Sequence, residues 1–216
     1  MNEQNLLNKC SNIEGLSFAQ IAQSLGAVPS HTAVMRKGWV GQALERLLGL
    51  KNNTLPEPDF KNLGIELKTL PLNHMQKPVE STFITGISLL NIHQETWQTS
   101  RCWSKLKKIL WIPIEGDNNI PFLSRRIGKA ILWSPSSKDT AILQKDWTEL
   151  TSYILLGRLD EIDAKFGEYL QVRPKAATGH SLTYAYDKHG HKTLTLPRGF
   201  YLRSSFTAKI YCEFLR

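Results

Sequence analysis

Apolar residues recur at helical spacing in four segments of the chain. The first segment follows a capping-box pattern formed by Ser17 and Gln20. Gly26, Gly49 and Gly157 follow three of the segments, where a glycine commonly ends a helix, and a serine begins the fourth. The predicted helices cover 18–25, 39–48, 138–156 and 204–215.

Apolar and polar residues alternate over most of the segment 64–70, which predicts a strand. Glu66 and Lys68 are two residues apart there, so they project from the same face, opposite Leu67. Further strands are predicted over 82–87, 109–114, 130–133, 168–172 and 193–196. Because strands and helices are mixed along the whole chain, the predicted class is α/β or α+β, with a mixed sheet flanked by helices.

Composition is ordinary for a globular protein, but the charge is not. Of the 216 residues, 41% are hydrophobic and 21% are charged, which excludes a disordered, collagen-like or coiled-coil chain. The net charge of +8 favours a polyanionic partner such as nucleic acid. Segments 97–133 and 171–216 are basic, whereas 138–168 is acidic. The two basic segments are interpreted either as two walls of a cleft or as a scattered solvated surface.

Nothing in the chain predicts a secreted or membrane protein. The three cysteines are widely spaced and form no CxxC pair, which is typical of a reduced compartment. The N-terminus lacks the pattern of a secretory signal, and the longest apolar run, 109–114, is far shorter than the roughly 20 residues that span a bilayer. We therefore expect a cytoplasmic protein with no membrane partner.

Candidate chemistry is concentrated between Asp59 and Lys68. Asp59 follows a proline-rich turn, and Glu66 and Lys68 lie on the predicted strand that comes next. A short hairpin-like connection would bring the two carboxylates together, and a hard cation such as Mg²⁺ or Mn²⁺ would relieve their repulsion. Lys68 would then orient or deprotonate a water that attacks a phosphodiester. Glu45, on the predicted helix 39–48, is a candidate third carboxylate.

The same pattern has a simpler interpretation. An aspartate followed by Glu-x-Lys is short enough to occur by chance, and Glu66 and Lys68 alone would also suit a solvated charge face on a strand. The net positive charge and the basic segments favour the nuclease interpretation.

Five longer segments carry a family resemblance. They are RKGWVGQALERLLG (36–49), PDFKNLGIELKTLP (58–71), KLKKILWIPIEG (105–116), GEYLQVRPKA (167–176) and LPRGFYLRSSF (196–206). In order and spacing they resemble the MutH family of DNA mismatch-repair endonucleases, which belongs to the restriction-endonuclease-like superfamily with the PD-(D/E)xK active site. The active-site triplet shows no departure, whereas the first 30 residues and 180–192 match least well.

The resemblance implies a fold and an activity. The expected fold is a restriction-endonuclease-like core within one unit of 1–216, with a catalytic lobe near 1–110 and a DNA-reading lobe near 111–216 that together form a DNA-binding cleft. The family nicks the unmethylated strand of hemimethylated GATC sites on the 5′ side of the G. It needs Mg²⁺, in whose place Mn²⁺ or Ca²⁺ would also fit, and it is activated by MutL after MutS finds a mismatch.

The resemblance also implies roles for individual residues. Asp59 and Glu66 would hold the metal together with the Leu67 carbonyl, while Lys68 would position the water and Glu45 would support the site. The positions that match DNA-contacting residues of the family are Lys37, Phe83, Lys105, Arg173, Pro174, Lys175, Arg198, Gly199 and Tyr201. Among these, 173–175 match the base-reading loop, and Arg198, Gly199 and Tyr201 match the segment that senses adenine N6.

Two other functions stay open. One active site per chain suits a monomer that nicks, but a restriction-type homodimer would cut both strands. A non-catalytic DNA-binding adaptor would bind in a salt-dependent manner and cleave nothing. The acidic segment 138–168 is a candidate docking face for a partner.

Overall fold

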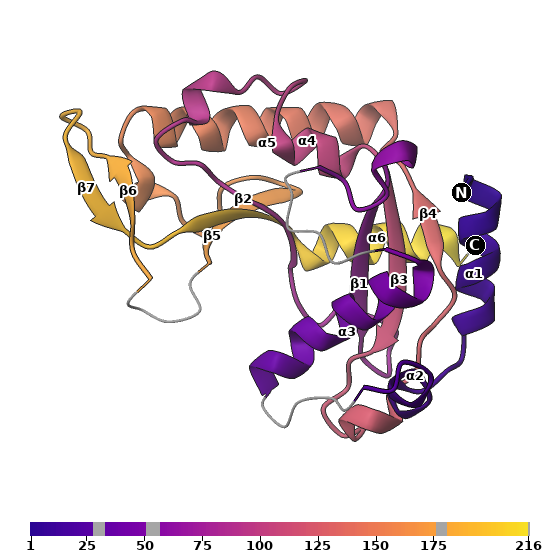
Figure 1. Ribbon diagram of the computed structural model, residues 1–216. Coiled ribbons are helices and arrows are strands. Elements are labelled where there is room, and N and C mark those ends of the chain that lie inside the picture. Colours follow the sequence, from indigo (N-terminus) through magenta and orange to yellow (C-terminus); the bar gives the residue numbers. More distant parts are fainter. Residues whose placement is uncertain (28–32, 51–56, 176–180, 216) are drawn as a thin grey trace. The chain divides into compact units, whose positions relative to one another are not determined.

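Figure 1 shows the computed structural model of the chain, which describes residues 1–27, 33–50, 57–175 and 181–215, without the side chains of 33–37. The chain forms two compact units: Met1–Glu80 with Lys108–Trp133, and Ser81–Lys107 with Ser134–Arg216. This division differs from the expected boundary near residue 110, because Lys108–Trp133 supplies strands to the sheet of the first unit.

The first unit contains a three-stranded sheet in the order β1 (Glu66–Leu72), β3 (Ile109–Glu115) and β4 (Ile131–Trp133). Strand β1 runs parallel to β3, and β4 runs antiparallel to it. Three helices belong to the same unit: α1 (Glu3–Ile13), α2 (Phe18–Ser24) and α3 (Ala33–Leu48).

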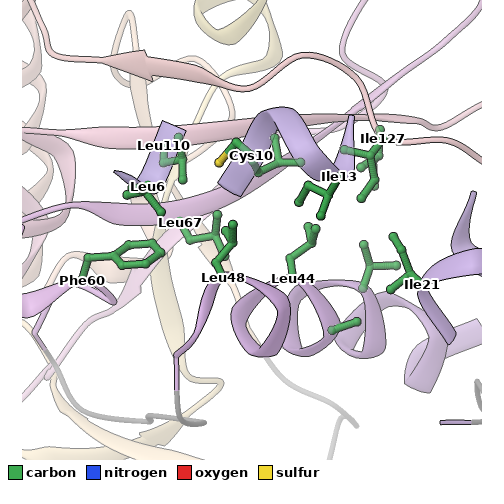
Figure 2. Packing of buried hydrophobic residues seen from close by; sticks show 14 of the residues in the cluster. Leu6, Cys10, Ile13, Ile21, Leu44, Leu48, Phe60, Leu67, Leu110 and Ile127 are labelled. Carbon is green, nitrogen blue, oxygen red and sulfur yellow. The ribbon is translucent and has the colours of Figure 1, made fainter. Parts of the chain in front are cut away.

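Buried apolar side chains join these helices to one face of the sheet. Figure 2 shows Leu6 of α1 and Leu44 and Leu48 of α3 around Leu67 of β1 and Leu110 of β3. Burying such a side chain contributes about 1.5–3 kcal/mol. Because successive strand residues face opposite sides, the burial of Leu67 in this core directs its two neighbours, residues 66 and 68, to the other face of β1.

The second unit is built on an antiparallel sheet in the order β2 (Thr82–Gly86), β8 (Arg198–Leu202) and β5 (Leu170–Pro174). A separate hairpin pairs β6 (Thr183–Tyr186) with β7 (Lys192–Thr195). The helices of this unit are α4 (Arg101–Leu106), α5 (Ser137–Leu155) and α6 (Ser204–Phe214). Short 3-10 turns in the two units cover Lys61–Leu63, Ile92–Gln94, Phe122–Ser124 and Leu159–Glu161.

One buried aspartate fixes where β5 begins. Asp146 of α5 is 2% exposed, and its carboxylate accepts hydrogen bonds from the backbone N–H groups of Glu168, Tyr169 and Leu170 at 2.7–2.9 Å. Gly167 stands just before this segment with a φ of 76°, and a Cβ there would lie 1.9 Å from the Leu170 carbonyl oxygen. The acidic side chain therefore has an internal role and does not contribute to an exposed docking face.

Most of the predicted elements are confirmed. The helices predicted over 18–25, 39–48 and 138–156 are α2, α3 and α5, and α2 has the predicted capping box. Five predicted strands are observed close to their expected positions as β1, β2, β3, β4 and β7, whereas β5 begins two residues later than expected. The pattern did not reveal α1, α4, β6 or β8.

The serine cap predicted for the last helix is wrong. The N-cap of α6 is Arg203, and no side chain caps the helix there. The Arg203 guanidinium instead donates to the carbonyl oxygens of Ala164, Phe166 and Gly167, so it ties the start of α6 to the segment before β5. Among the described residues, no helix combines the length and the apolar character needed to cross a membrane.

Candidate functional site

The predicted acid–lysine pair lies on β1, on the face opposite the helices. Glu66 is 2% exposed, and the Lys68 Nζ lies 2.7 Å from its Oε1. Removing a carboxylate from water costs several kcal/mol unless a counter-charge compensates, and the ammonium of Lys68 provides that charge. The pair is therefore a buried ion pair rather than a solvated charge face.

A tight turn places Asp59 beside this strand. Phe60 and Ile65, both buried, form an antiparallel bridge that closes the turn at Lys61–Leu63. The chain reverses through Gly64, whose φ of 64° is the left-handed conformation that glycine adopts without strain. The hairpin-like connection predicted between the two carboxylates is thus present in the structure.

Asp59 reaches the open edge of β1. Its Oδ2 accepts a hydrogen bond from the Leu67 backbone N–H at 2.8 Å, whereas the Glu66 N–H donates to Lys108 on the β3 side at 3.0 Å. Within the described residues β1 is an edge strand, because the sheet order is β1-β3-β4. The N–H and C=O of one strand residue point to the same side, so the Leu67 carbonyl also faces the edge where Asp59 lies.

These groups fit a hard divalent cation. Two carboxylates from residues 59 and 66 and the carbonyl of residue 67 are oxygen donors, which Mg²⁺, Mn²⁺ and Ca²⁺ prefer. Among the described residues, no three acidic, histidine or cysteine side chains gather as a metal site. Glu45, the candidate third carboxylate, is half-buried on α3 in the same unit.

A second group of predicted residues comes together in the sheet of the second unit. Strand β8 is central, so Gly199 pairs with Gly86 on one side and Arg173 on the other. Tyr201 pairs with Phe83 on β2 in the same way. The sheet thus assembles residues from three strands that are far apart in the sequence.

Aromatic and cationic side chains contact one another across these strands. The Lys175 Nζ lies 3.2 Å from the centroid of the Phe83 ring, and the Phe83 and Tyr201 rings pack in a T-shaped arrangement at 5.2 Å between centroids. A Cβ added at Gly199 would lie 2.7 Å from the Phe83 ring, so the absence of a side chain there makes room for it. Lys175 and the neighbouring Pro174 are exposed, and the backbone N–H of Lys175 donates to the Pro197 carbonyl at 2.7 Å.

Two arginines complete this group. Arg173 is exposed, and its Nη1 donates to the Ser81 hydroxyl, which also accepts from the amide of Gln171. Arg198 is half-buried, and its Nη1 is buried without a hydrogen-bond partner among the described residues. Sequence patterns gave no signal for Ser81 or Gln171, because the serine is 90 residues from the glutamine.

Two of the predicted DNA-contacting residues are not part of this group. Lys105 is buried on α4 in the second unit, and the side chain of Lys37 lies outside the described residues. The structure therefore brings together Asp59, Glu66, Leu67 and Lys68 in one unit and seven of the predicted DNA-contacting residues in the other. The latter seven are Phe83, Arg173, Pro174, Lys175, Arg198, Gly199 and Tyr201.

The fold and the site together define a class of protein. A mixed α+β chain that carries Pro-Asp and Glu-x-Lys on a tight turn and an adjoining strand is restriction-endonuclease-like. The family model described as DNA mismatch repair enzyme MutH matches residues 48–146.

Similarity to individual proteins covers nearly the whole chain. The DNA mismatch repair protein MutH of Vibrio cholerae is 47% identical over 208 residues, which are 96% of this chain and 94% of that protein. The proteins of the same name from Actinobacillus pleuropneumoniae and Haemophilus ducreyi are each 46% identical over 214 residues, which cover 99% of this chain and 95% of each relative. The chain belongs to the MutH family.

Proposed function

We propose that this MutH-family DNA mismatch-repair endonuclease nicks the unmethylated strand of hemimethylated GATC sites, on the 5′ side of the G, in a Mg²⁺-dependent reaction. The observation that carries the proposal is the arrangement of Asp59, Glu66 and Lys68. Two carboxylates and an ammonium lie within one turn and one strand, where the Asp59 carboxylate contacts the Leu67 backbone and the Glu66 carboxylate contacts Lys68.

The residues of the site have separate tasks. Asp59, Glu66 and the Leu67 carbonyl would hold Mg²⁺, which when bound supplies a Lewis acid for the phosphate oxygens and lowers the pKa of water. Lys68 is held by Glu66, so its remaining N–H groups can orient the attacking water and stabilise negative charge on the phosphate. Glu45 of α3 would support the site without adding a ligand to the metal. Lys37 and Lys105 would contact the phosphate backbone, which positions DNA without reading its sequence.

Sequence reading is assigned to the sheet of the second unit. Arginine and lysine on either side of Pro174 can donate to guanine O6 and N7 in the major groove. The segment formed by Arg198, Gly199 and Tyr201 would test whether adenine N6 carries a methyl group, and Phe83 would contact the groove.

Regulation and stoichiometry follow from the same proposal. One set of catalytic residues per chain cuts one strand per encounter, so we expect a monomer to be sufficient for nicking. Activation would come from MutL, with MutS acting upstream. Omitting MutL is expected to lower the nicking rate without changing the cleaved position.

The test is a nicking assay on a circular plasmid with one GATC site in unmethylated, hemimethylated and fully methylated forms, with and without MutL. Nicked circles should form only with Mg²⁺ and only when one strand is unmethylated. Loss of a group that only supports the metal ligands lowers activity by roughly 10- to 100-fold. Asp59→Asn changes a proposed ligand itself, so it should lower the nicking rate by more than that.

Glu57→Gln is the matched control, because Glu57 lies two residues before Asp59 and forms an ion pair with the exposed Lys61. Its rate should equal that of the unmodified protein. Full Mg²⁺-dependent nicking by Asp59→Asn would overturn the mechanism, and linear product without a nicked intermediate would favour the homodimer.

A further inference from the structure

The hydroxyl of Ser81 connects the two outer strands of the second unit's sheet. Its Oγ accepts a hydrogen bond from Gln171 Nε2 at 2.7 Å and a longer one from Arg173 Nη1 at 3.4 Å. Ser81 immediately precedes β2, whereas Gln171 and Arg173 lie on β5, and β8 runs between these strands. The contact therefore crosses the central strand.

The two hydrogen bonds differ in strength and exposure. Gln171 is 7% exposed, so its short bond to the hydroxyl is protected from water. Arg173 is exposed and its bond is long, so the guanidinium is held more loosely. A serine hydroxyl has two acceptor lone pairs, and the firm bond from Gln171 takes one and orients the other towards the arginine.

Strand geometry aligns the same residues. Gln171 and Arg173 are two residues apart on β5, so their side chains leave the same face of the sheet. Only one of the five guanidinium N–H groups is bonded to Ser81, which leaves the others for a base edge or a phosphate. Arginine reads a base through two parallel hydrogen bonds, and this requires the guanidinium plane to be well placed.

We propose that Ser81 and Gln171 are positioning residues that orient Arg173 for base reading. The proposal rests on the proposed function, because it assigns a task to residues around the same DNA-reading site. Gln171 fixes the hydroxyl of Ser81, and the hydroxyl limits the orientations of the Arg173 side chain before DNA binds. Loss of the hydroxyl should therefore reduce selectivity for the recognised sequence more than it reduces affinity for DNA in general.

The experiment measures a selectivity ratio, which is kcat/KM for hemimethylated GATC duplexes divided by kcat/KM for duplexes that carry one substituted base pair in the site. Ser81→Ala should lower this ratio by about three- to tenfold, the effect of one hydrogen bond. Gln171→Met, which keeps the volume but removes the donor, should lower it in the same direction. Ser81→Thr retains an oxygen at the same position and should restore most of the ratio.

Two further readouts separate positioning from a general structural effect. In an Arg173→Ala background, Ser81→Ala should cause no additional loss of selectivity, because the hydroxyl acts through the arginine. The salt dependence of binding to a duplex without GATC should be the same for Ser81→Ala and the unmodified protein. Ser104→Ala, which removes a hydroxyl that donates to the Arg101 carbonyl within α4, is the matched control.

The outcomes are distinct. If the unmodified protein does not discriminate GATC from substituted sites, the proposed function and this inference are both overturned. If it discriminates and Ser81→Ala keeps the full ratio, the positioning role alone is overturned. A loss of equal size in the Arg173→Ala background would also overturn it, because the serine would then act independently of the arginine.

Discussion

The proposed catalytic group and the proposed DNA-reading group of this protein are built in different ways. Asp59, Glu66 and Lys68 lie within ten residues of one another, on one turn and the strand that follows it. The reading group, in contrast, combines β2, β5 and β8, whose residues are brought together only by the folded sheet. The proposed catalytic group thus depends on local backbone geometry, whereas the proposed reading group depends on long-range strand register.

This difference predicts how each group responds to change. A local group keeps its geometry as long as its turn and strand form, so a side-chain substitution there should remove chemistry and leave the rest of the fold intact. A group whose residues are brought together by strand register is sensitive to any residue that sets the distance between the strands. Substitutions in the two groups should therefore separate loss of catalysis from loss of sequence selectivity.

The largest effect is expected for Lys68→Ala. Removing the ammonium that would orient the attacking water should lower the nicking rate by roughly 10²–10⁴-fold. Glu66 is buried and would lose this ammonium partner, so the free energy of unfolding should also fall by about 1–3 kcal/mol. Nicking rates and urea unfolding measure the two effects.

Lys61→Ala is the control for this substitution. Lys61 forms an ion pair with Glu57 at 2.9 Å in the adjoining turn, but its side chain is 69% exposed. Exposed pairs contribute at most about 1 kcal/mol, so neither rate nor stability should change appreciably. Equal losses in the two variants would contradict the assignment of a local catalytic group.

An intermediate effect is expected for Gly199→Ala in the reading group. The new methyl group would lie 2.7 Å from the Phe83 ring and 3.1 Å from the Thr85 carbonyl oxygen. The ring must then shift, which changes its contacts with Lys175 and Tyr201, and the crowding should cost about 1–3 kcal/mol of unfolding free energy. Selectivity for GATC should fall, while the Mg²⁺ dependence of the remaining cleavage should be unchanged.

Gly86 offers a matched comparison, because it is the register partner of Gly199 on β2. A Cβ at Gly86 would meet nothing within 4 Å, so Gly86→Ala should keep both stability and selectivity. If the two alanine variants behaved alike, the close approach of Phe83 to β8 would not matter for reading.

The smallest effect is expected at an ion pair between α5 and α6, whose loss should leave both groups intact. The Asp139 carboxylate binds Lys209 Nζ at 2.7 Å and the Ser136 hydroxyl at 2.6 Å. Burial raises the pKa of Asp139, but these hydrogen bonds outweigh it, so the pKa lies below its ordinary value of 3.8. The stabilisation is therefore complete above the unfolded pKa and is lost as the pH falls through the lowered folded pKa.

Thermal unfolding of Asp139→Asn and of the unmodified protein between pH 7 and pH 3 tests the direction of this pH dependence. The variant should be less stable at pH 7 by about 1 kcal/mol, and the difference should shrink as the pH falls below 3.8. Glu149→Gln, on the exposed side of the same helix, should show no such dependence. A difference that stays constant over the whole range would contradict the role of the Asp139 charge.

Local patterns revealed much of the fold. The alternation in 64–70 predicted both β1 and the shared face of Glu66 and Lys68, because side-chain direction in a strand has a period of two. The spacing of Asp59 from Glu66 predicted the connecting turn. Capping residues and glycines gave the ends of α2, α3 and α5 within a few residues, except for the longer start of α3.

Long-range structure was not visible in those patterns. Strand β8 contains an arginine and a glycine directly after a proline, so it lacks the signal of a strand, although it is the central strand of its sheet. Helix α1 is rich in polar residues, and only Leu6, Cys10 and Ile13 mark its buried side. The contacts of Phe83 with Lys175 and Tyr201 depend on the register of three strands, which no spacing along the chain specifies.

The path of the backbone limits how this protein can be divided or recombined. The polypeptide passes from one compact unit to the other after Glu80, after Lys107 and after Trp133. A fragment that stops at the first of these points would lack the central strand β3, so it should aggregate rather than fold. Chimeras that exchange DNA-reading parts between relatives will therefore require several simultaneous junctions.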